Sequence, residues 1–190
     1  MSFHDLEDNA KGFLRGAQIN IGSVQIRAEE NESVSLYQLD LVDIFSVTPR
    51  TRFFKPLSWK VYAGLERQLT KGVDQLTAHV TGGGGGSWRL LENGQIYALA
   101  TGRLEFNKQL TRAVEPALGF ATGILQHFGR STAHLAFSGE HFFDRLYRLR
   151  AAYTQNFVIT TNHSVNLSAK YEWQDVDEFS DVRLNYQYYF

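Results

Sequence analysis

The last ten residues of the chain alternate strictly between apolar and polar side chains. Counted back from the C-terminus, every second residue is apolar or aromatic: Phe190, Tyr188, Tyr186, Leu184 and Val182. The residues between them are Tyr189, Gln187, Asn185, Arg183 and Asp181. Because successive side chains of a β-strand point to opposite faces, this period of two predicts a strand with one apolar face and one polar face. A chain end with this pattern is expected to be a paired strand, since frayed ends are usually polar.

The same alternation recurs along most of the chain, in about ten stretches separated by turn signals. The clearest stretch is residues 57–66, in which Leu57, Trp59, Val61, Ala63 and Leu65 share one face. Residues 142–153 fit both helical and strand spacing, and a strand is preferred because the neighbouring stretches are strands. The pattern therefore predicts an all-β fold.

Two irregular places carry glycine. Residues 13–27 change parity near Gly22 and Ser23, which predicts a β-bulge there. Five consecutive glycines at 82–86 have strand patterns on both sides. They therefore predict a sharp bend or a close approach of two backbones, in preference to a flexible linker.

Composition narrows the class of protein. The 190 residues suit one domain, with a polar lead-in at residues 1–11 and a β-barrel domain at 12–190. The mean hydropathy is -0.29, and no apolar run approaches the roughly 20 residues of a spanning helix. A transmembrane barrel remains compatible with these values, because half of each strand faces the lumen and is polar. The net charge of -1 gives no support for nucleic-acid binding, and the absence of cysteine excludes disulfides and thiol chemistry.

The direction of the apolar faces decides between a membrane barrel and a soluble one. Nine Tyr, fourteen Phe and three Trp are many for this length, and this aromatic bulk is hard to pack inside a small soluble core. We therefore expect an antiparallel up-and-down transmembrane β-barrel of about ten strands, with eight or twelve as alternatives. The expected lipid-facing aromatic girdle is Trp59, Tyr171, Trp173, Tyr186, Tyr188 and Phe190. The expected lumenal charge network, whose signs must match if it is buried, is Lys60, Glu66, Arg103, Glu105, Arg148, Arg150, Lys170, Glu172 and Arg183.

Two resemblances extend these expectations. The terminal strand resembles that of bacterial outer-membrane barrels, which implies recognition by the barrel-assembly machinery. The chain from Phe3 also resembles the C-terminal region of an uncharacterised Gram-negative envelope family, through residues 3–9, 16–19, 41–44, 53–60 and 64–67 and the glycine run. That family joins a papain-like periplasmic N-terminal domain, of the lipoprotein N-acyl transferase type, to a β-barrel. The resemblance implies a barrel module of a longer protein, without the catalytic Cys and His.

No catalytic residue, metal site or cofactor is predicted. His134 and Ser138 share a parity with Glu140 beyond them, so a lipid hydrolase or acyl-transfer barrel is one alternative. A soluble periplasmic ligand-binding barrel is the other. The expected function is that of an outer-membrane barrel with a plugged or narrow lumen, which anchors a larger envelope protein. Its expected partners are outer-membrane lipid, the barrel-assembly machinery and the covalent N-terminal domain.

Overall fold

The computed structural model describes residue 6 and residues 16–27, 35–70, 73–107, 113–143, 147–174 and 177–188. These residues form eleven β-strands. Their bounds are β1 Ala17–Asn20, β2 Ser23–Arg27, β3 Ser35–Ser46, β4 Ser58–Thr70, β5 Val73–Leu90, β6 Gly94–Phe106, β7 Val114–Phe128, β8 Ser131–Phe142, β9 Arg148–Val158, β10 His163–Gln174 and β11 Asp177–Tyr188. No helix in the described part of the chain is long and apolar enough to cross a bilayer.

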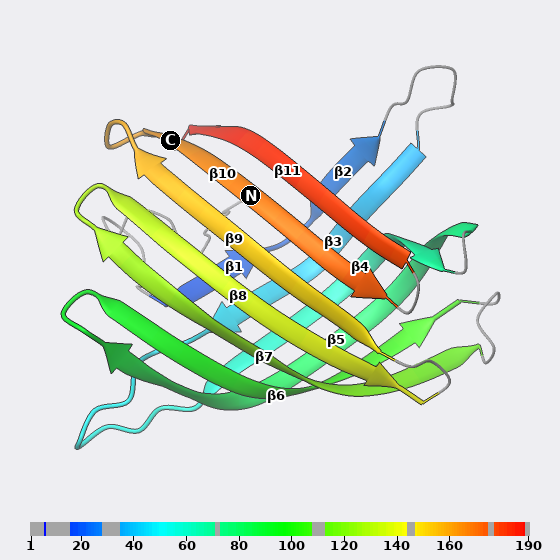
Figure 1. Cartoon of the computed structure of the whole chain (residues 1–190), viewed down its shortest axis with the longest axis horizontal. Coiled ribbons are helices and arrows are strands. Elements are labelled where there is room, and N and C mark those ends of the chain that lie inside the picture. The colour runs from blue at the N-terminus through cyan, green and yellow to red at the C-terminus, as the bar shows by residue number, and fades with distance from the viewer. Residues whose placement is uncertain are drawn as a thin grey trace.

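Each strand from β3 onward pairs antiparallel with the next along the chain, so the sheet is up-and-down (Figure 1). β1 and β2 both pair with β3, at opposite ends of it. They are therefore one interrupted strand, broken at Ile21 and at Gly22, whose φ of 73° suits glycine. At the position of the predicted β-bulge, near Gly22 and Ser23, the strand is thus interrupted, and the register shift against β3 lies further on, between Gln25 and Ile26. The predicted all-β, antiparallel, up-and-down fold is confirmed, with about ten strand positions as expected.

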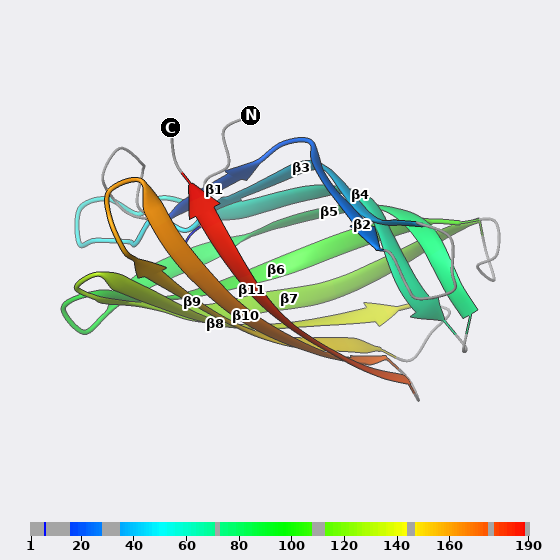
Figure 2. The ribbon, with the colours of Figure 1, turned by 90° about the horizontal axis from the view of Figure 1, so that it is seen from above.

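The sheet is curled into a half-barrel (Figures 1 and 2). In a flat sheet, β4 and β9 would lie about 24 Å apart, because they are separated by five strand spacings. Arg150 on β9 nevertheless reaches Glu66 on β4, with 3.4 Å between Nη2 and Oε2. At the two edges, the Nη1 of Arg183 on β11 donates to the Oε1 of Gln25 on β2 at 2.7 Å. No backbone ladder joins β11 to β1 or β2 among the described residues.

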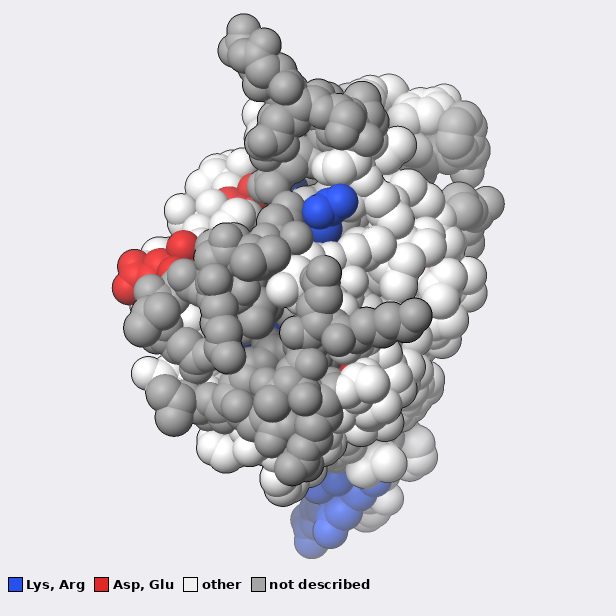
Figure 3. Space-filling view, turned by 90° about the vertical axis from the view of Figure 1, so that its right-hand side faces the viewer, with Lys and Arg blue, Asp and Glu red and all other residues white. Residues whose placement is uncertain are grey.

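Apolar side chains lie mainly on the outer, convex face. Exposed examples within the strands are Val80, Leu104, Leu118, Phe120, Ile124, Leu135, Phe137, Leu149, Phe157 and Leu167. In the end-on view of Figure 3, the described surface along the right-hand flank is mostly white, that is, free of Lys, Arg, Asp and Glu side chains. The strand positions that face the interior are occupied instead by buried polar residues, which include Glu66, Arg103 and Arg148.

The interior of the half-barrel contains an apolar region and a charged region, one after the other along the strand direction. Near the end where β1 starts and β11 ends, hereafter the termini end (left in Figure 1), an apolar cluster fills the interior. It consists of Leu6, Phe45, Val47, Tyr97, Leu99 and Leu125. Leu6 is the one described residue of the predicted lead-in at 1–11, and the rest of that prediction lies outside the described residues. The buried charged residues Glu66, Arg103 and Arg148 lie toward the opposite end.

The glycine run lies inside β5, and two of its members meet a close backbone. A Cβ built on Gly85 would lie 2.0 Å from the carbonyl oxygen of Ala98 on β6, and one built on Gly83 would lie 2.9 Å from that of Ala100. Gly82 and Gly84 have no such contact. The prediction of a close backbone approach is therefore confirmed at Gly83 and Gly85.

Candidate functional site

The candidate site is a cluster of charged side chains on the inner face of the sheet, hereafter the ionic network. These side chains come from β4, β6, β8, β9 and β10 and point into the interior. Where one strand supplies two of them, they are two residues apart, because alternate residues of a strand share a face. Its members are the cations Arg103, Arg148, Arg150 and Lys170 and the carboxylates of Glu66, Glu105, Glu140 and Glu172. Four positive and four negative charges cancel, so the network as a whole is neutral.

Two ion pairs follow directly from strand register. Arg150 lies opposite Glu172 in the β9–β10 ladder, and its Nε lies 2.6 Å from Oε2. Arg148 lies opposite Glu140 in the β8–β9 ladder, and its Nη1 lies 3.3 Å from Oε2. Directly opposed residues have neighbouring Cβ atoms, so such pairs form without any crossing of the lumen.

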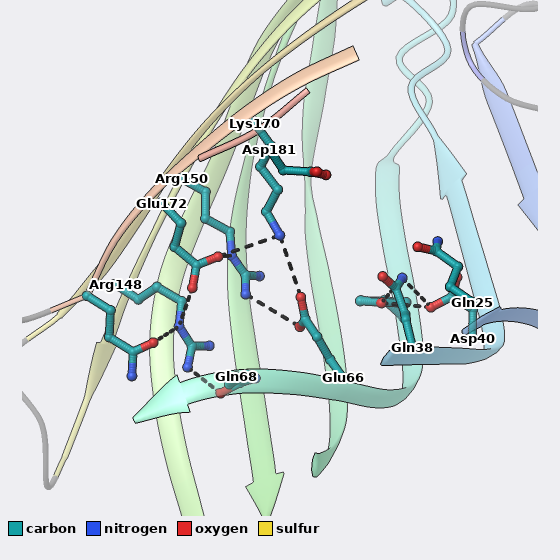
Figure 4. Close-up of polar contacts among 12 residues, drawn as sticks. Gln25, Gln38, Asp40, Glu66, Gln68, Arg148, Arg150, Lys170, Glu172 and Asp181 are labelled. Atoms are coloured by element: carbon teal, nitrogen blue, oxygen red, sulfur yellow. Dashed lines mark hydrogen bonds and ion pairs between the residues drawn. The ribbon is translucent and has the colours of Figure 1, made fainter. Parts of the chain in front are cut away.

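Other contacts cross the interior between strands that are not neighbours (Figure 4). Glu66 on β4 pairs with Arg150 at 3.4 Å and with the Nζ of Lys170 on β10 at 3.6 Å. Arg148 on β9 lies 2.8 Å from Glu105 on β6. The Nη2 of Arg148 also donates to the Oε1 of Gln68 at 2.7 Å. These contacts tie opposite walls of the half-barrel together.

The centre of the network is fully enclosed. The side chains of Arg148 and Glu105 are 0% exposed, and that of Arg103 is 2% exposed. Moving such charges out of water costs several kcal/mol for each ion unless they are paired and hydrogen-bonded. Glu105 meets this condition, because its Oε1 accepts from Arg103 at 2.9 Å, Arg148 at 2.8 Å and Gln68 at 3.1 Å.

The sequence-predicted network and the observed one differ at their margins. Lys60 lies over the rings of Phe45 and Tyr62, at 5.7 and 5.5 Å, and Arg183 pairs with Asp181 and with Gln25 at the edge of the sheet. These two cations therefore lie apart from the cluster. The other seven predicted members, Glu66, Arg103, Glu105, Arg148, Arg150, Lys170 and Glu172, come together in it.

Three residues of the site are absent from the network predicted from sequence. They are Glu140, which the sequence places only in the alternative hydrolase, and the two glutamines Gln68 and Gln174. The Nε of Arg148 donates to the Oε1 of Gln174 at 3.2 Å. The signal that identifies Gln68 and Gln174 is parity, since each lies two residues beyond Glu66 or Glu172 on the same strand.

Two histidines of the inner face, His134 and His79, each lie against a tyrosine. His134 contacts the hydroxyl of Tyr97 through Nε2 at 3.0 Å. Ser138 lies four residues away on β8, about 13 Å along the strand, which is too far for a hydrogen-bonded nucleophile and base. His79 is buried against the ring of Tyr62, at 4.4 Å between centroids, and neither ring nitrogen has a hydrogen-bond partner within the described residues. No group of three or more His, Asp or Glu side chains suited to a metal ion occurs in this part of the chain.

The predicted girdle residues lie on the outer face where the structure describes them. Trp59, Trp173, Tyr186 and Tyr188 are exposed, and Tyr171 packs edge-on against Trp173, with 4.2 Å between ring centroids. Phe190 lies outside the described residues. The outer face thus carries aromatic side chains, as the alternation predicts.

Comparison with known proteins gives a family and no more. No curated protein and no solved structure matches the chain. One family model, described as a domain of unknown function, DUF7840, matches residues 1–189. The chain therefore belongs to the DUF7840 family.

Proposed function

We propose that this domain is an outer-membrane β-barrel with a closed lumen, which anchors a larger envelope protein in the membrane. The observation that carries this proposal is the inverted distribution of side chains. A neutral network of eight charged groups lies inside, with all but Lys170 largely enclosed, while the outer face exposes large apolar residues along most strands. A soluble protein would place these two classes the other way round.

Strand length supports the same conclusion. A tilted strand needs about 9 to 11 residues to cross a bilayer. The continuous strands β3 to β11 have between 11 and 18 residues. Each of them is therefore long enough to span the hydrocarbon core.

The proposals about the full-length protein and its partners are supported by the two sequence resemblances alone. We propose that the full-length protein is a Gram-negative envelope protein with a papain-like periplasmic domain before this barrel. The alternation in β11 would be recognised by the barrel-assembly machinery. The domain itself would contribute no catalytic residue and bind no cofactor, and its principal partner would be outer-membrane lipid.

The test places a charge at two depths on the outer face. Phe120 lies near the middle of β7 and Phe128 is its last residue, and both side chains are exposed. In a bilayer, Phe120→Arg should lower the free energy of unfolding by about 2–4 kcal/mol and Phe128→Arg by about 0–1 kcal/mol. Urea unfolding of the vesicle-inserted chain, followed by tryptophan fluorescence, measures both values.

A soluble barrel gives a different result. Both substitutions would then be near neutral, because an exposed Phe would be replaced by a solvated Arg, and the chain would remain monodisperse without detergent. Gel mobility before and after boiling is the accompanying measurement, since a folded membrane barrel should migrate differently when unheated.

A further inference from the structure

The turns at the termini end, together with the strand ends beside them, are hereafter called the rim. It consists of residues 47–57, 88–93, 128–130 and 159–162, that is, the connections from β3 to β4, β5 to β6, β7 to β8 and β9 to β10 together with the last residues of β5 (88–90) and of β7 (Phe128). All four lie at the same end because alternate strands of an up-and-down sheet run in opposite directions (Figure 1). The rim therefore borders the outer apolar face described above.

The rim is strongly basic although the chain is not. It contains the cations Arg50, Arg52, Lys55, Arg89 and Arg130 and a single carboxylate, that of Glu92. Five positive charges less one negative charge give +4, whereas the whole chain has a net charge of -1. Such a surface attracts anions.

The same rim exposes large apolar side chains. Phe53 is 95% exposed, Phe54 is 65% exposed and Leu91 is 82% exposed. Arg52 lies over the ring of Phe53, with 5.9 Å between Cζ and the ring centroid. Apolar side chains interleaved with cations are typical of surfaces that insert into the interface of a bilayer.

The loop at residues 47–57 is held in place by hydrogen bonds. The amide of Thr51 donates to the carbonyl of Phe54 at 2.7 Å, and the amide of Phe54 donates to the Oγ1 of Thr51 at 3.0 Å. Arg50 donates from Nε to the carbonyl of Pro56 at 3.2 Å and from Nη2 to that of Gly85 at 3.1 Å. The two phenylalanines are thus presented outward on a fixed turn.

Leu91 provides an independent observation. Its φ of 56° lies in the left-handed region, where an L-residue with a large side chain is strained and Gly or Asn is preferred. Folding alone would favour Asn at this position. A strained, exposed leucine is consistent with a side chain that is buried only when a bilayer is present.

We infer that the rim binds the headgroup layer of a bilayer leaflet rich in anionic phospholipid, with Phe53, Phe54 and Leu91 inserted below the phosphates. The inference rests on the proposed membrane function and adds to it a lipid class and the end of the barrel that meets it. Each cation near an anionic surface strengthens binding about fivefold. Arg52 and Lys55 are exposed and lie beside the two phenylalanines.

The test compares insertion into two kinds of vesicle. The chain is diluted from urea into vesicles of phosphatidylcholine, or of phosphatidylcholine with about one third phosphatidylglycerol. Initial insertion rates are read from the unheated gel mobility of the folded form. The wild-type chain should insert faster into the anionic vesicles, and Arg52→Gln with Lys55→Gln should reduce the ratio of the two rates by about fivefold for each cation removed.

Apolar insertion is tested by Phe53→Ser with Phe54→Ser and, separately, by Leu91→Asn, which suits the local backbone and so should not hinder folding. Both should slow insertion into either vesicle. Phe143→Ser is the matched control, because Phe143 is also 65% exposed but lies at the opposite end, after β8. An unchanged lipid ratio in the cation variant, or equal slowing by Phe143→Ser, would overturn the inference while membrane insertion stands. A wild-type chain that inserts into neither vesicle would overturn the membrane function itself.

Discussion

At the scale of single residues, Glu105 is the anion on which the buried network depends most. Its carboxylate is fully enclosed and accepts from two arginines and one glutamine. Glu105→Gln leaves a net buried positive charge, so the free energy of unfolding should fall by about 3–5 kcal/mol. Urea unfolding in vesicles measures this loss, and Glu92→Gln in the exposed β5–β6 turn should change it by less than about 0.5 kcal/mol.

The reason for that loss is charge imbalance, which a second substitution can remove. Glu105→Gln combined with Arg148→Met leaves three cations and three carboxylates in the network. The double variant should therefore be more stable than the sum of the two single variants predicts. Strict additivity would show that the two side chains do not interact in the folded barrel.

His79 differs from Glu105, because it is a buried polar residue whose ring nitrogens have no hydrogen-bond partner among the described residues. An unsatisfied buried polar group costs about 1–3 kcal/mol. His79→Phe keeps an aromatic ring against Tyr62 and removes that cost, so thermal or urea unfolding should show equal or greater stability. Tyr62→Phe is the comparison, and it should be destabilising because the hydroxyl donates to Asp40 at 2.8 Å. A clear loss in His79→Phe would show that the imidazole binds a partner.

At the scale of elements, β5 combines two kinds of glycine. Gly85→Ala would place a Cβ 2.0 Å from a backbone oxygen of β6, so it should lower the free energy of unfolding by about 1–3 kcal/mol or more. Gly84→Ala is the adjacent control, since its Cβ would have no neighbour closer than 4.0 Å. That change should be neutral or stabilising by up to about 1 kcal/mol. Equal effects of the two substitutions, measured by urea unfolding, would contradict a close approach of β5 and β6.

The elements themselves could be predicted because alternation is a local property. The ambiguous stretch at 142–153 does supply strands, with β8 ending at Phe142 and β9 starting at Arg148. In the β5–β6 turn, Asn93 and Gly94 are the residues that tolerate a left-handed conformation, yet the left-handed residue is Leu91. Turn signals report what a residue tolerates, whereas the conformation also depends on the register of the two strands. In β3, a register shift between Asp40 and Val42 interrupts the pairing with β4, and the same strand carries the alternation on both sides of it.

The pairing inside the network could be predicted only in part, because it depends on the curl of the whole sheet. Arg150 with Glu172 follows from strand register. Arg148 with Glu105, and Lys170 with Glu66, join strands that are three and six places apart in the sheet. Alternation fixes the face on which a side chain lies but contains no information on which opposite wall it meets. The burial of Leu6 in the apolar cluster is another long-range contact that strand periodicity does not reveal.

At the scale of the whole molecule, the interior has two successive barriers, the apolar cluster near the termini end and the ionic network beyond it. Because each of these layers would close the lumen of the proposed membrane barrel, the wild-type chain should give only background conductance in a planar bilayer. Tyr97→Ala with Leu125→Ala removes much of the first barrier, and Glu105→Ala with Arg148→Ala removes the centre of the second. Either pair alone should remain closed, because the other barrier is intact, whereas the four substitutions together should produce discrete conductance steps. Heat-dependent gel mobility establishes that each variant is folded before it is measured. Conductance in the wild-type chain, or opening by one pair alone, would show that the two layers do not close the lumen independently.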